Sequence, residues 1–297
     1  MVEIENRVRS MKRFGMALGG GGLKGMAHIG VLQILWDNGL KTQYISGTSA
    51  GSIIAMLYAC GTSPYKMQAI VSHLSPADYL DYNIMGTLKY LISLVWPTYQ
   101  APLEGIILGD KLERLVYALT DGKKLSEAEI PLAIISCDIN SGRKVIFTNQ
   151  EMEFERSDVI VIKDALISEA VRSSVSIPVT FKPKNFAGLK MVDGGLKEIV
   201  PSSMAKRMGA DYILSVNLGQ EMYDSQVKGI PQIISRTLSI LTYETSEMEE
   251  EIYSDMTIFP EIQGTRLDDT EAIEKIIRAG RRAMKEKLAQ LKRELGA

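Results

Sequence analysis

The stretch Gly19-Gly20-Gly21-Gly22-Leu23-Lys24-Gly25 and the turn Gly47-Thr48-Ser49-Ala50-Gly51 together decide the fold of this chain. Each follows a short apolar run and precedes a sequence with helical periodicity, so both are expected at strand-to-helix turns of an α/β protein. The first stretch offers backbone N–H groups that can converge on an anion. The second matches the G-x-S-x-G nucleophile elbow, whose glycines make room for a strained serine. The pair therefore predicts a serine hydrolase.

Apolar runs of strand length alternate with helical periodicity along most of the chain. This order predicts a three-layer α/β/α fold with a mainly parallel central sheet and additional C-terminal helices. Strands are expected at residues 14–18, 44–46, 131–137, 144–148 and 211–218, and helices at 27–37, 49–60 and 64–73. We expect a catalytic core over residues 14–209, with the last strands and the C-terminal helices, 210–297, packed on it.

The C-terminal part of the chain has a different character, because strand-like runs become rare beyond Gly219. Acidic residues gather at Glu244 and at 247–251, and we interpret them as a solvated helix face. Residues 268–295 carry apolar side chains at three- and four-residue spacing among many charges. That spacing predicts an amphipathic helix packed on the core.

Composition narrows the class of protein. The 297 residues, 45% hydrophobic and 24% charged, fit a globular protein, and a formal net charge of -2 offers no basic footprint for nucleic acid. The two cysteines, Cys60 and Cys137, show neither metal-ligand spacing nor the density of a disulfide scaffold. Residues 1–13 contain no apolar segment typical of a secretory signal, and no apolar run reaches the roughly 18 residues of a membrane span. We therefore expect a cytoplasmic protein.

A nucleotide site is the main alternative for the first glycine stretch. Gly20, Gly22 and Gly25 satisfy G-x-G-x-x-G, which would suit a nicotinamide-dependent oxidoreductase. Such a site also needs a carboxylate at the end of the second strand, and residues 44–49 contain none. A Walker loop fails as well, since Lys24 is followed by glycine. Apart from a tight turn, the remaining interpretation is an oxyanion hole, in which backbone donors stabilise a developing negative charge.

A serine nucleophile needs a base, and the usual base is histidine held by a carboxylate. The chain contains two histidines, His28 and His73, and neither follows an acid in the order found in α/β-hydrolases. Both stay open as candidate bases, although a packed or capping role suits them better. Neither histidine therefore stands where the sequence order of a triad would place it.

Two carboxylates at strand ends compete for the role of base. Asp193 ends an apolar run in Met191-Val192-Asp193-Gly194-Gly195, at the edge where α/β sheets place their ligands. Asp138 is followed by a turn-forming Ile-Asn-Ser-Gly sequence. We rank Asp138 second as a base and first as structural support.

These motifs make the chain resemble the patatin-like phospholipases. The resemblance rests on the glycine stretch 19–25, the elbow 47–51 and the Asp-Gly-Gly element 193–195, in that order, and covers residues 14–209. It implies a Ser-Asp dyad without histidine, with Ser49 as nucleophile and Asp193 as proton acceptor. It also implies a lipid acyl ester as substrate and no cofactor or metal.

The mechanism expected from this resemblance is acyl transfer through the enzyme. Asp193 accepts the proton of Ser49 as the hydroxyl attacks the ester, and the amides of Gly20, Gly21 and Gly22 hold the oxyanion. Water then releases the acyl group. Transfer of the acyl group to another alcohol, and a catalytically silent regulatory relative, are the alternatives.

The segment 78–108 is rich in large apolar residues and ends its apolar run at Pro97. It could be a lid, line an acyl channel, or form a peripheral contact with a membrane. An ordinary core helix with an irregular connection is the simpler alternative.

Overall fold

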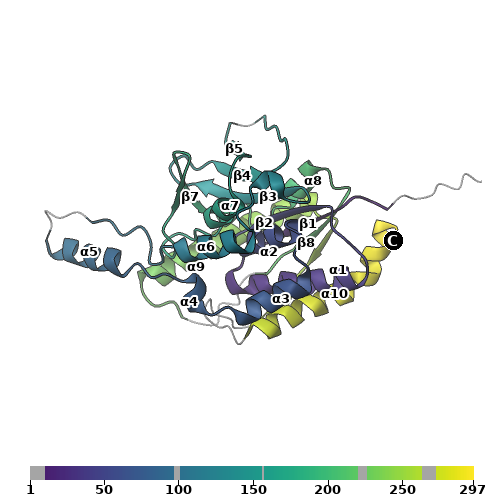
Figure 1. Cartoon of the computed structure of the whole chain (residues 1–297), viewed down its shortest axis with the longest axis horizontal. Coiled ribbons are helices and arrows are strands. Elements are labelled where there is room, and N and C mark those ends of the chain that lie inside the picture. Colours follow the sequence, from purple (N-terminus) through teal and green to yellow (C-terminus); the bar gives the residue numbers. More distant parts are fainter. Residues whose placement is uncertain (1–10, 97–100, 156, 220–225, 263–271) are drawn as a thin grey trace, which may run out of the picture.

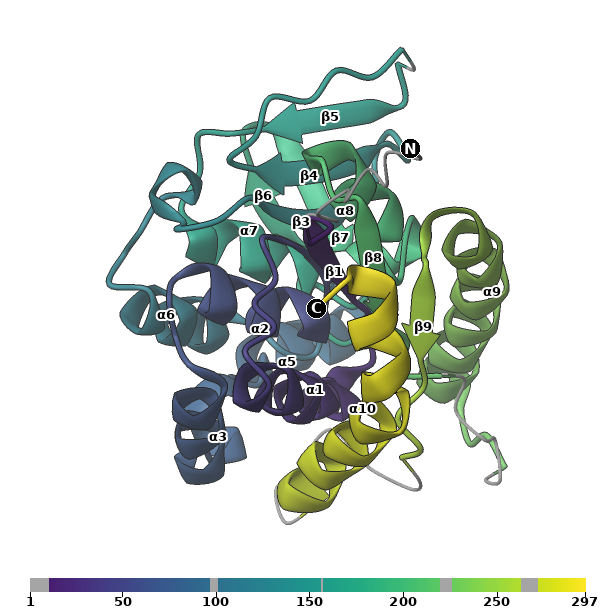
Figure 2. The same ribbon diagram turned by 90° about the vertical axis from the view of Figure 1, so that its right-hand side faces the viewer.

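A nine-stranded sheet forms the centre of the described structure, as Figures 1 and 2 show. The computed structural model describes the chain apart from residues 1–10, 97–100, 156, 220–225 and 263–271. The strand order is β5-β4-β3-β2-β1-β8-β9, with β7 paired to β3 and β6 paired to β7. The strands are β1 (Phe14–Leu18), β2 (Tyr44–Thr48), β3 (Leu132–Asp138), β4 (Lys144–Thr148), β5 (Val159–Ile162), β6 (Lys184–Phe186), β7 (Leu189–Asp193), β8 (Tyr212–Val216) and β9 (Met256–Ile258).

Five neighbouring strands, β3, β2, β1, β8 and β9, run parallel, whereas β4 and β7 run antiparallel to β3. Helices cover both faces of this sheet (Figure 2). They are α1 (Ala27–Asp37), α2 (Ala50–Ala59), α3 (Pro64–His73), α4 (Pro76–Tyr79), α5 (Ile84–Val95), α6 (Asp110–Leu119), α7 (Ile167–Ser174), α8 (Ser202–Met208), α9 (Ile230–Tyr253) and α10 (Ile273–Leu295). The predicted three-layer α/β/α fold with a mainly parallel sheet is confirmed.

Strand side chains are buried on both faces of the sheet. In β8, Leu214 belongs to the large core shared with α1 and α10, whereas Ile213 packs with Ala205 of α8. In β3, Ile134 and Ile135 divide between the two faces in the same way. Successive side chains of a strand point to opposite faces, so a sheet covered on both sides needs unbroken apolar runs. That is why the strands were visible in the sequence as continuous apolar segments.

Several predicted boundaries agree with the structure. The strand at 14–18 and the helix at 64–73 have the predicted limits, and the strands predicted at 131–137 and 144–148 are the antiparallel pair β3 and β4. The helix predicted from Ser49 begins at Ala50, because Ser49 is its N-cap and is not helical. The short strands β5 and β9 were not predicted. The three residues of β9 carry too little periodicity to be distinguished from a loop.

The C-terminal amphipathic helix is confirmed as α10, although residues 268–271 of the predicted range lie outside the described residues. It crosses α1 closely enough for the two backbones to touch. A Cβ at Gly280 would lie 2.0 Å from the Ala27 carbonyl oxygen, and a Cβ at Gly30 would lie 2.0 Å from the Ile277 carbonyl oxygen. A residue with a side chain at either position would force the helices apart. The two glycines thus fix α10 on the core.

The acidic cluster lies on α9 and is not wholly a solvated face. Glu250 is buried and accepts a hydrogen bond of 2.6 Å from the Asn217 side chain, whereas Glu251 is exposed. The side chains of Glu244 and residues 247–249 lie outside the described residues. The prediction is therefore wrong for Glu250, whose buried carboxylate accepts from a side chain next to the end of β8.

The apolar segment 78–108 contains the end of α4 and all of α5, and α5 extends away from the body of the molecule (Figure 1). None of the described side chains of α5 is buried. An ordinary core helix is therefore excluded. Within the described ranges, no helix combines the length and the apolar character needed to cross a bilayer.

Candidate active site

Ser49 occupies a strained turn between β2 and α2. Its backbone has φ 52° and ψ -122°, in the left-handed half of conformational space that residues with a side chain rarely adopt. A Cβ at Gly51 would lie 2.0 Å from the Leu18 carbonyl oxygen, and a Cβ at Gly47 would lie 2.5 Å from the Gly51 carbonyl oxygen. The two glycines of G-x-S-x-G are therefore required by close backbone packing. This is the geometry of a nucleophile elbow.

The backbone of Ser49 is held by a residue far along the chain. Its N–H donates a hydrogen bond of 2.8 Å to the hydroxyl of Ser174, the last residue of α7. The sequence motifs gave Ser174 no role. Only the packing of α7 beside the elbow reveals the contact.

Loss of the Ser174 hydroxyl should slow the reaction of Ser49 without removing it. In Ser174→Ala, the buried N–H of Ser49 has no hydrogen-bond acceptor, which costs about 1–3 kcal/mol. The turn can reduce this cost by moving away from its reactive geometry. We expect kcat toward an ester to fall by about tenfold or more at this cost. Ser72→Ala, an exposed serine on α3, serves as the control. Unchanged kcat in Ser174→Ala would show that the turn keeps its geometry without this bond.

Asp193 ends β7, and its carboxyl group is buried beside the elbow. Its backbone N–H donates to the Ser176 carbonyl oxygen at 2.9 Å, and its Oδ1 accepts the Gly195 N–H at 2.8 Å. Oδ2 is buried without a hydrogen-bond partner among the described residues. Burial raises the pKa of Asp193 to about 6, although the Ser49 hydroxyl and the Gly195 N–H act to lower it. A buried acceptor with a raised pKa is suited to taking up a proton.

Ser49 and Asp193 are therefore brought together by the fold, 144 positions apart in sequence. The Ser49 hydroxyl is near enough to influence the pKa of the carboxyl group, but no hydrogen bond of ordinary geometry joins the two side chains. Catalytic hydrogen bonds are often long in a site without substrate and tighten when substrate binds. Both residues are nearly enclosed, with 5% of Ser49 and 7% of Asp193 exposed.

The glycine stretch passes directly over the elbow. A Cβ at Gly20 would lie 3.3 Å from the Cβ of Ser49. The Gly20 N–H, predicted to hold an oxyanion, instead donates to the Ile199 carbonyl oxygen at 2.9 Å. Among the described residues, no acceptor is found for the N–H groups of Gly21 and Gly22, at the start of a 3-10 helix. Of the three predicted amides, those of Gly21 and Gly22 are thus open to a substrate oxygen.

The histidines are engaged elsewhere. His28 is fully buried and donates from Nε2 to the Gly19 carbonyl oxygen at 2.8 Å, and burial lowers the pKa of His28 to about 4. It is therefore neutral at pH 7 and braces the glycine stretch. His73 donates from Nδ1 to the Ala69 carbonyl oxygen at 2.7 Å on the exposed face of α3. Both histidines act here as structural donors to backbone carbonyls.

Asp138 supports a turn, as predicted. Its carboxylate accepts hydrogen bonds from the N–H groups of Ser141 and Lys190 at 3.1 Å and 3.0 Å, and from the Ser141 hydroxyl. Burial acts to raise the pKa of Asp138, but these hydrogen bonds outweigh it and hold the pKa below its usual value. A carboxylate that already accepts several hydrogen bonds and has a lowered pKa is a poor base.

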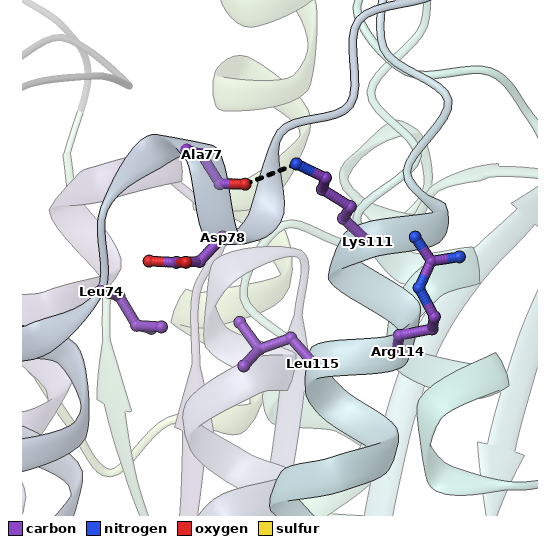
Figure 3. Close-up of a pocket in the computed structure, with 6 residues that line it drawn as sticks. All are labelled: Leu74, Ala77, Asp78, Lys111, Arg114 and Leu115. Atoms are coloured by element: carbon purple, nitrogen blue, oxygen red, sulfur yellow. Dashed lines mark hydrogen bonds between the residues drawn. The ribbon is translucent and has the colours of Figure 1, made fainter.

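A depression of the described surface lies away from these residues. It has a volume of about 550 Å³ and is formed chiefly by α4 and α6 (Figure 3). In it, the ammonium group of Lys111 donates to the Ala77 carbonyl oxygen at 2.7 Å, as the dashed line in Figure 3 shows. Neither Ser49 nor Asp193 lines it. Across the described residues, no group of three or more His, Cys, Asp or Glu side chains is arranged to hold a metal ion.

A strained serine at a strand-to-helix turn, facing a buried carboxyl group in a three-layer α/β/α fold, defines the class of α/β proteins with a nucleophile elbow. The family model for patatin-like phospholipases matches residues 16–206. The chain belongs to this family.

Similar proteins carry related names. Lysophospholipase NTE1 of Debaryomyces hansenii is 26% identical over 213 residues, which are 72% of this chain and 12% of that protein. Patatin-like phospholipase domain-containing protein 6 of Mus musculus is 25% identical over 219 residues, 72% of this chain and 14% of that protein. The chain thus spans a small part of these relatives. The structure of VipD from Legionella pneumophila matches 95% of this chain and 67% of its own at 14% identity, with a TM-score of 0.50, and supports the fold alone.

Proposed function

We propose that this chain is a lipid acyl hydrolase of the phospholipase A or lysophospholipase type, with Ser49 as nucleophile and Asp193 as proton acceptor. The single observation that carries the proposal is the buried, unpaired Oδ2 of Asp193 beside the strained elbow. A buried polar atom without a partner is costly, so its position is best explained by a proton that it receives during the reaction. The names of the relatives support a lysophospholipid or phospholipid as substrate.

The proposed reaction proceeds through an acyl-enzyme. Asp193 takes the proton of Ser49 Oγ as this oxygen attacks the ester carbonyl carbon, and the N–H groups of Gly21 and Gly22 stabilise the oxyanion. The leaving alcohol receives the proton from Asp193, which leaves an ester between the acyl group and Ser49. Water then attacks this ester and gives a proton to Asp193. As the bond between the acyl carbon and Ser49 Oγ breaks, Asp193 returns this proton to Oγ and the fatty acid departs. A pKa near 6 makes Asp193 a stronger base than an ordinary aspartate while leaving it ionised at pH 7.

The proposal is tested by identifying the products. The protein is incubated with lysophosphatidylcholine, with phosphatidylcholine and with a short-chain nitrophenyl ester, each with and without glycerol as an acceptor, and the products are measured by mass spectrometry. We expect free fatty acid as the main product. Acylated glycerol as the main product would make the chain an acyltransferase. Absence of both turnover and labelling by a fluorophosphonate would make it a non-catalytic relative.

A further inference from the structure

Helix α5 is flanked by two chain segments that are hydrogen-bonded to each other. The N–H of Asn83 donates to the Ile106 carbonyl oxygen at 2.7 Å, and Tyr82 forms an antiparallel bridge with Ile107. The carboxylate of Asp81 accepts the Gly109 N–H at 2.7 Å. We call these segments, 81–83 and 105–109, the stalk. Its hydrogen bonds give α5 a fixed base even though the helix itself projects from the body (Figure 1).

The stalk is joined to the wall of the candidate active site. The Ile107 N–H donates to the Thr180 carbonyl oxygen at 2.8 Å, and the buried guanidinium of Arg172 donates to the carbonyl oxygens of Leu108 and Lys182. Arg172 lies on α7, the helix whose last residue, Ser174, holds the nucleophile. The position of α5 is thus tied to the elbow through α7.

The surface of α5 is apolar to an unusual degree for an exposed helix. Six of its large apolar side chains are between 49% and 76% exposed: Ile84, Met85, Leu88, Leu91, Ile92 and Leu94. Trp96, directly after the helix, is 67% exposed. Residues 82–96 contain one charged residue, Lys89, and no carboxylate. Such a continuous apolar surface marks a site of interaction.

The width of the apolar surface indicates what covers it. At about 100° per residue, the positions from Leu94 round to Met85 span an arc of about 180° of the helix, with Thr87 as its one polar position. A helix that packs on a protein buries a stripe of about 100° or somewhat more, so a groove of ordinary width would leave part of this arc in water. A bilayer surface can cover the whole arc, with the polar side containing Lys89 and Ser93 turned to water. A tryptophan at the border of the arc suits the headgroup region.

We propose that α5 inserts into the surface of a phospholipid bilayer and holds the candidate active site against it. The occupant is a lipid surface, because the arc is wide, free of acidic residues and bordered by Trp96. This inference rests on the proposed function in one respect: the lipid substrate would come from the bilayer surface that α5 binds. Binding to vesicles can be measured without turnover, so Ser49→Ala should bind vesicles as tightly as the parent protein.

The first test uses Trp96 as a reporter of its own environment. The chain contains two tryptophans, so Trp36→Phe leaves Trp96 alone. On addition of phosphatidylcholine vesicles, we expect its emission to shift to shorter wavelength and its quenching by iodide to decrease. Unchanged emission and unchanged quenching would overturn the proposal. A shift that grows with protein concentration in the absence of vesicles would overturn it in favour of pairing between two copies.

The second test compares two pairs of charge substitutions. Leu88→Glu with Leu91→Glu places two carboxylates in the apolar arc, and we expect co-sedimentation with the vesicles to weaken by about tenfold or more. The control, Ile139→Glu with Ile252→Glu, adds the same charge at exposed isoleucines outside α5 and should bind as the parent does. Circular dichroism and thermal unfolding confirm that both proteins fold. Equal binding by the two variants would refute a role for α5.

Discussion

Replacement of Ser49 by alanine is expected to lower ester hydrolysis by about 10⁴-fold or more, as the loss of a covalent nucleophile does in other serine hydrolases. In the proposed mechanism, the hydroxyl supplies the oxygen that forms the acyl-enzyme. Labelling by a fluorophosphonate should disappear at the same time. Activity is measured as kcat/KM on a nitrophenyl ester, and labelling by intact-protein mass spectrometry.

The matched control for this substitution is Ser72→Ala, which removes an exposed hydroxyl on α3 and should change neither measurement. Thermal unfolding shows whether Ser49→Ala retains the fold, since alanine must adopt the same positive φ of 52°. Hydrolysis or labelling that persists in a folded Ser49→Ala protein would mean that the nucleophile is another residue.

Replacement of Asp193 by asparagine is expected to lower kcat/KM by about 10²- to 10⁴-fold, the contribution usual for a general base. In the parent protein, kcat/KM should fall about tenfold per pH unit below a pKa of about 6, because the protonated carboxyl group cannot accept the proton of Ser49. The asparagine variant should lose this dependence. A parent profile that is flat between pH 5 and 7 would contradict a base with a pKa of about 6, and full activity of the asparagine variant would transfer the role of base to Asp138 or His28.

The same substitution should stabilise the fold at high pH. The pKa of Asp193 in the folded protein, about 6, lies above the 3.8 of an unperturbed aspartate, so the stability linked to this group is fully present below pH 3.8 and is lost as pH rises through about 6. A difference of this size corresponds to about 3 kcal/mol. Urea unfolding of Asp193→Asn should therefore show a gain at pH 8 that is absent at pH 3.5. Equal effects at both pH values would contradict the raised pKa.

Two sequence-based expectations stay predictions. The division at residue 209 separates a proposed catalytic core from 210–297, but β8 pairs in parallel with β1, so the second part completes the sheet of the first. The cytoplasmic location rests on the cysteines and the N-terminal sequence. Cys60 and Cys137 are both free.

The sequence by itself determined the elbow, the glycine stretch and the end of β7. These features depend on close contacts around a single turn. A Cβ at Gly47 would meet backbone atoms at the start of α2, and a Cβ at Gly51 would meet the end of the neighbouring strand β1. The alternation of buried segments likewise follows from a sheet covered on both faces. For this reason the fold and the candidate pair Ser49 and Asp193 could be predicted from patterns along the chain.

Only the tertiary structure decided how polar groups far apart in the sequence are paired. In the folded chain, the Gly20 N–H donates to the Ile199 carbonyl oxygen and the Ser49 N–H donates to the Ser174 hydroxyl. The buried Glu250 carboxylate accepts from the Asn217 side chain. The tertiary structure also leaves α5 outside the core, although its apolar composition would suit a buried helix equally well. A hydrogen bond or a buried face depends on which segments meet in space. That information is absent from the spacing of residues along the chain, because it arises when the helices pack on the sheet.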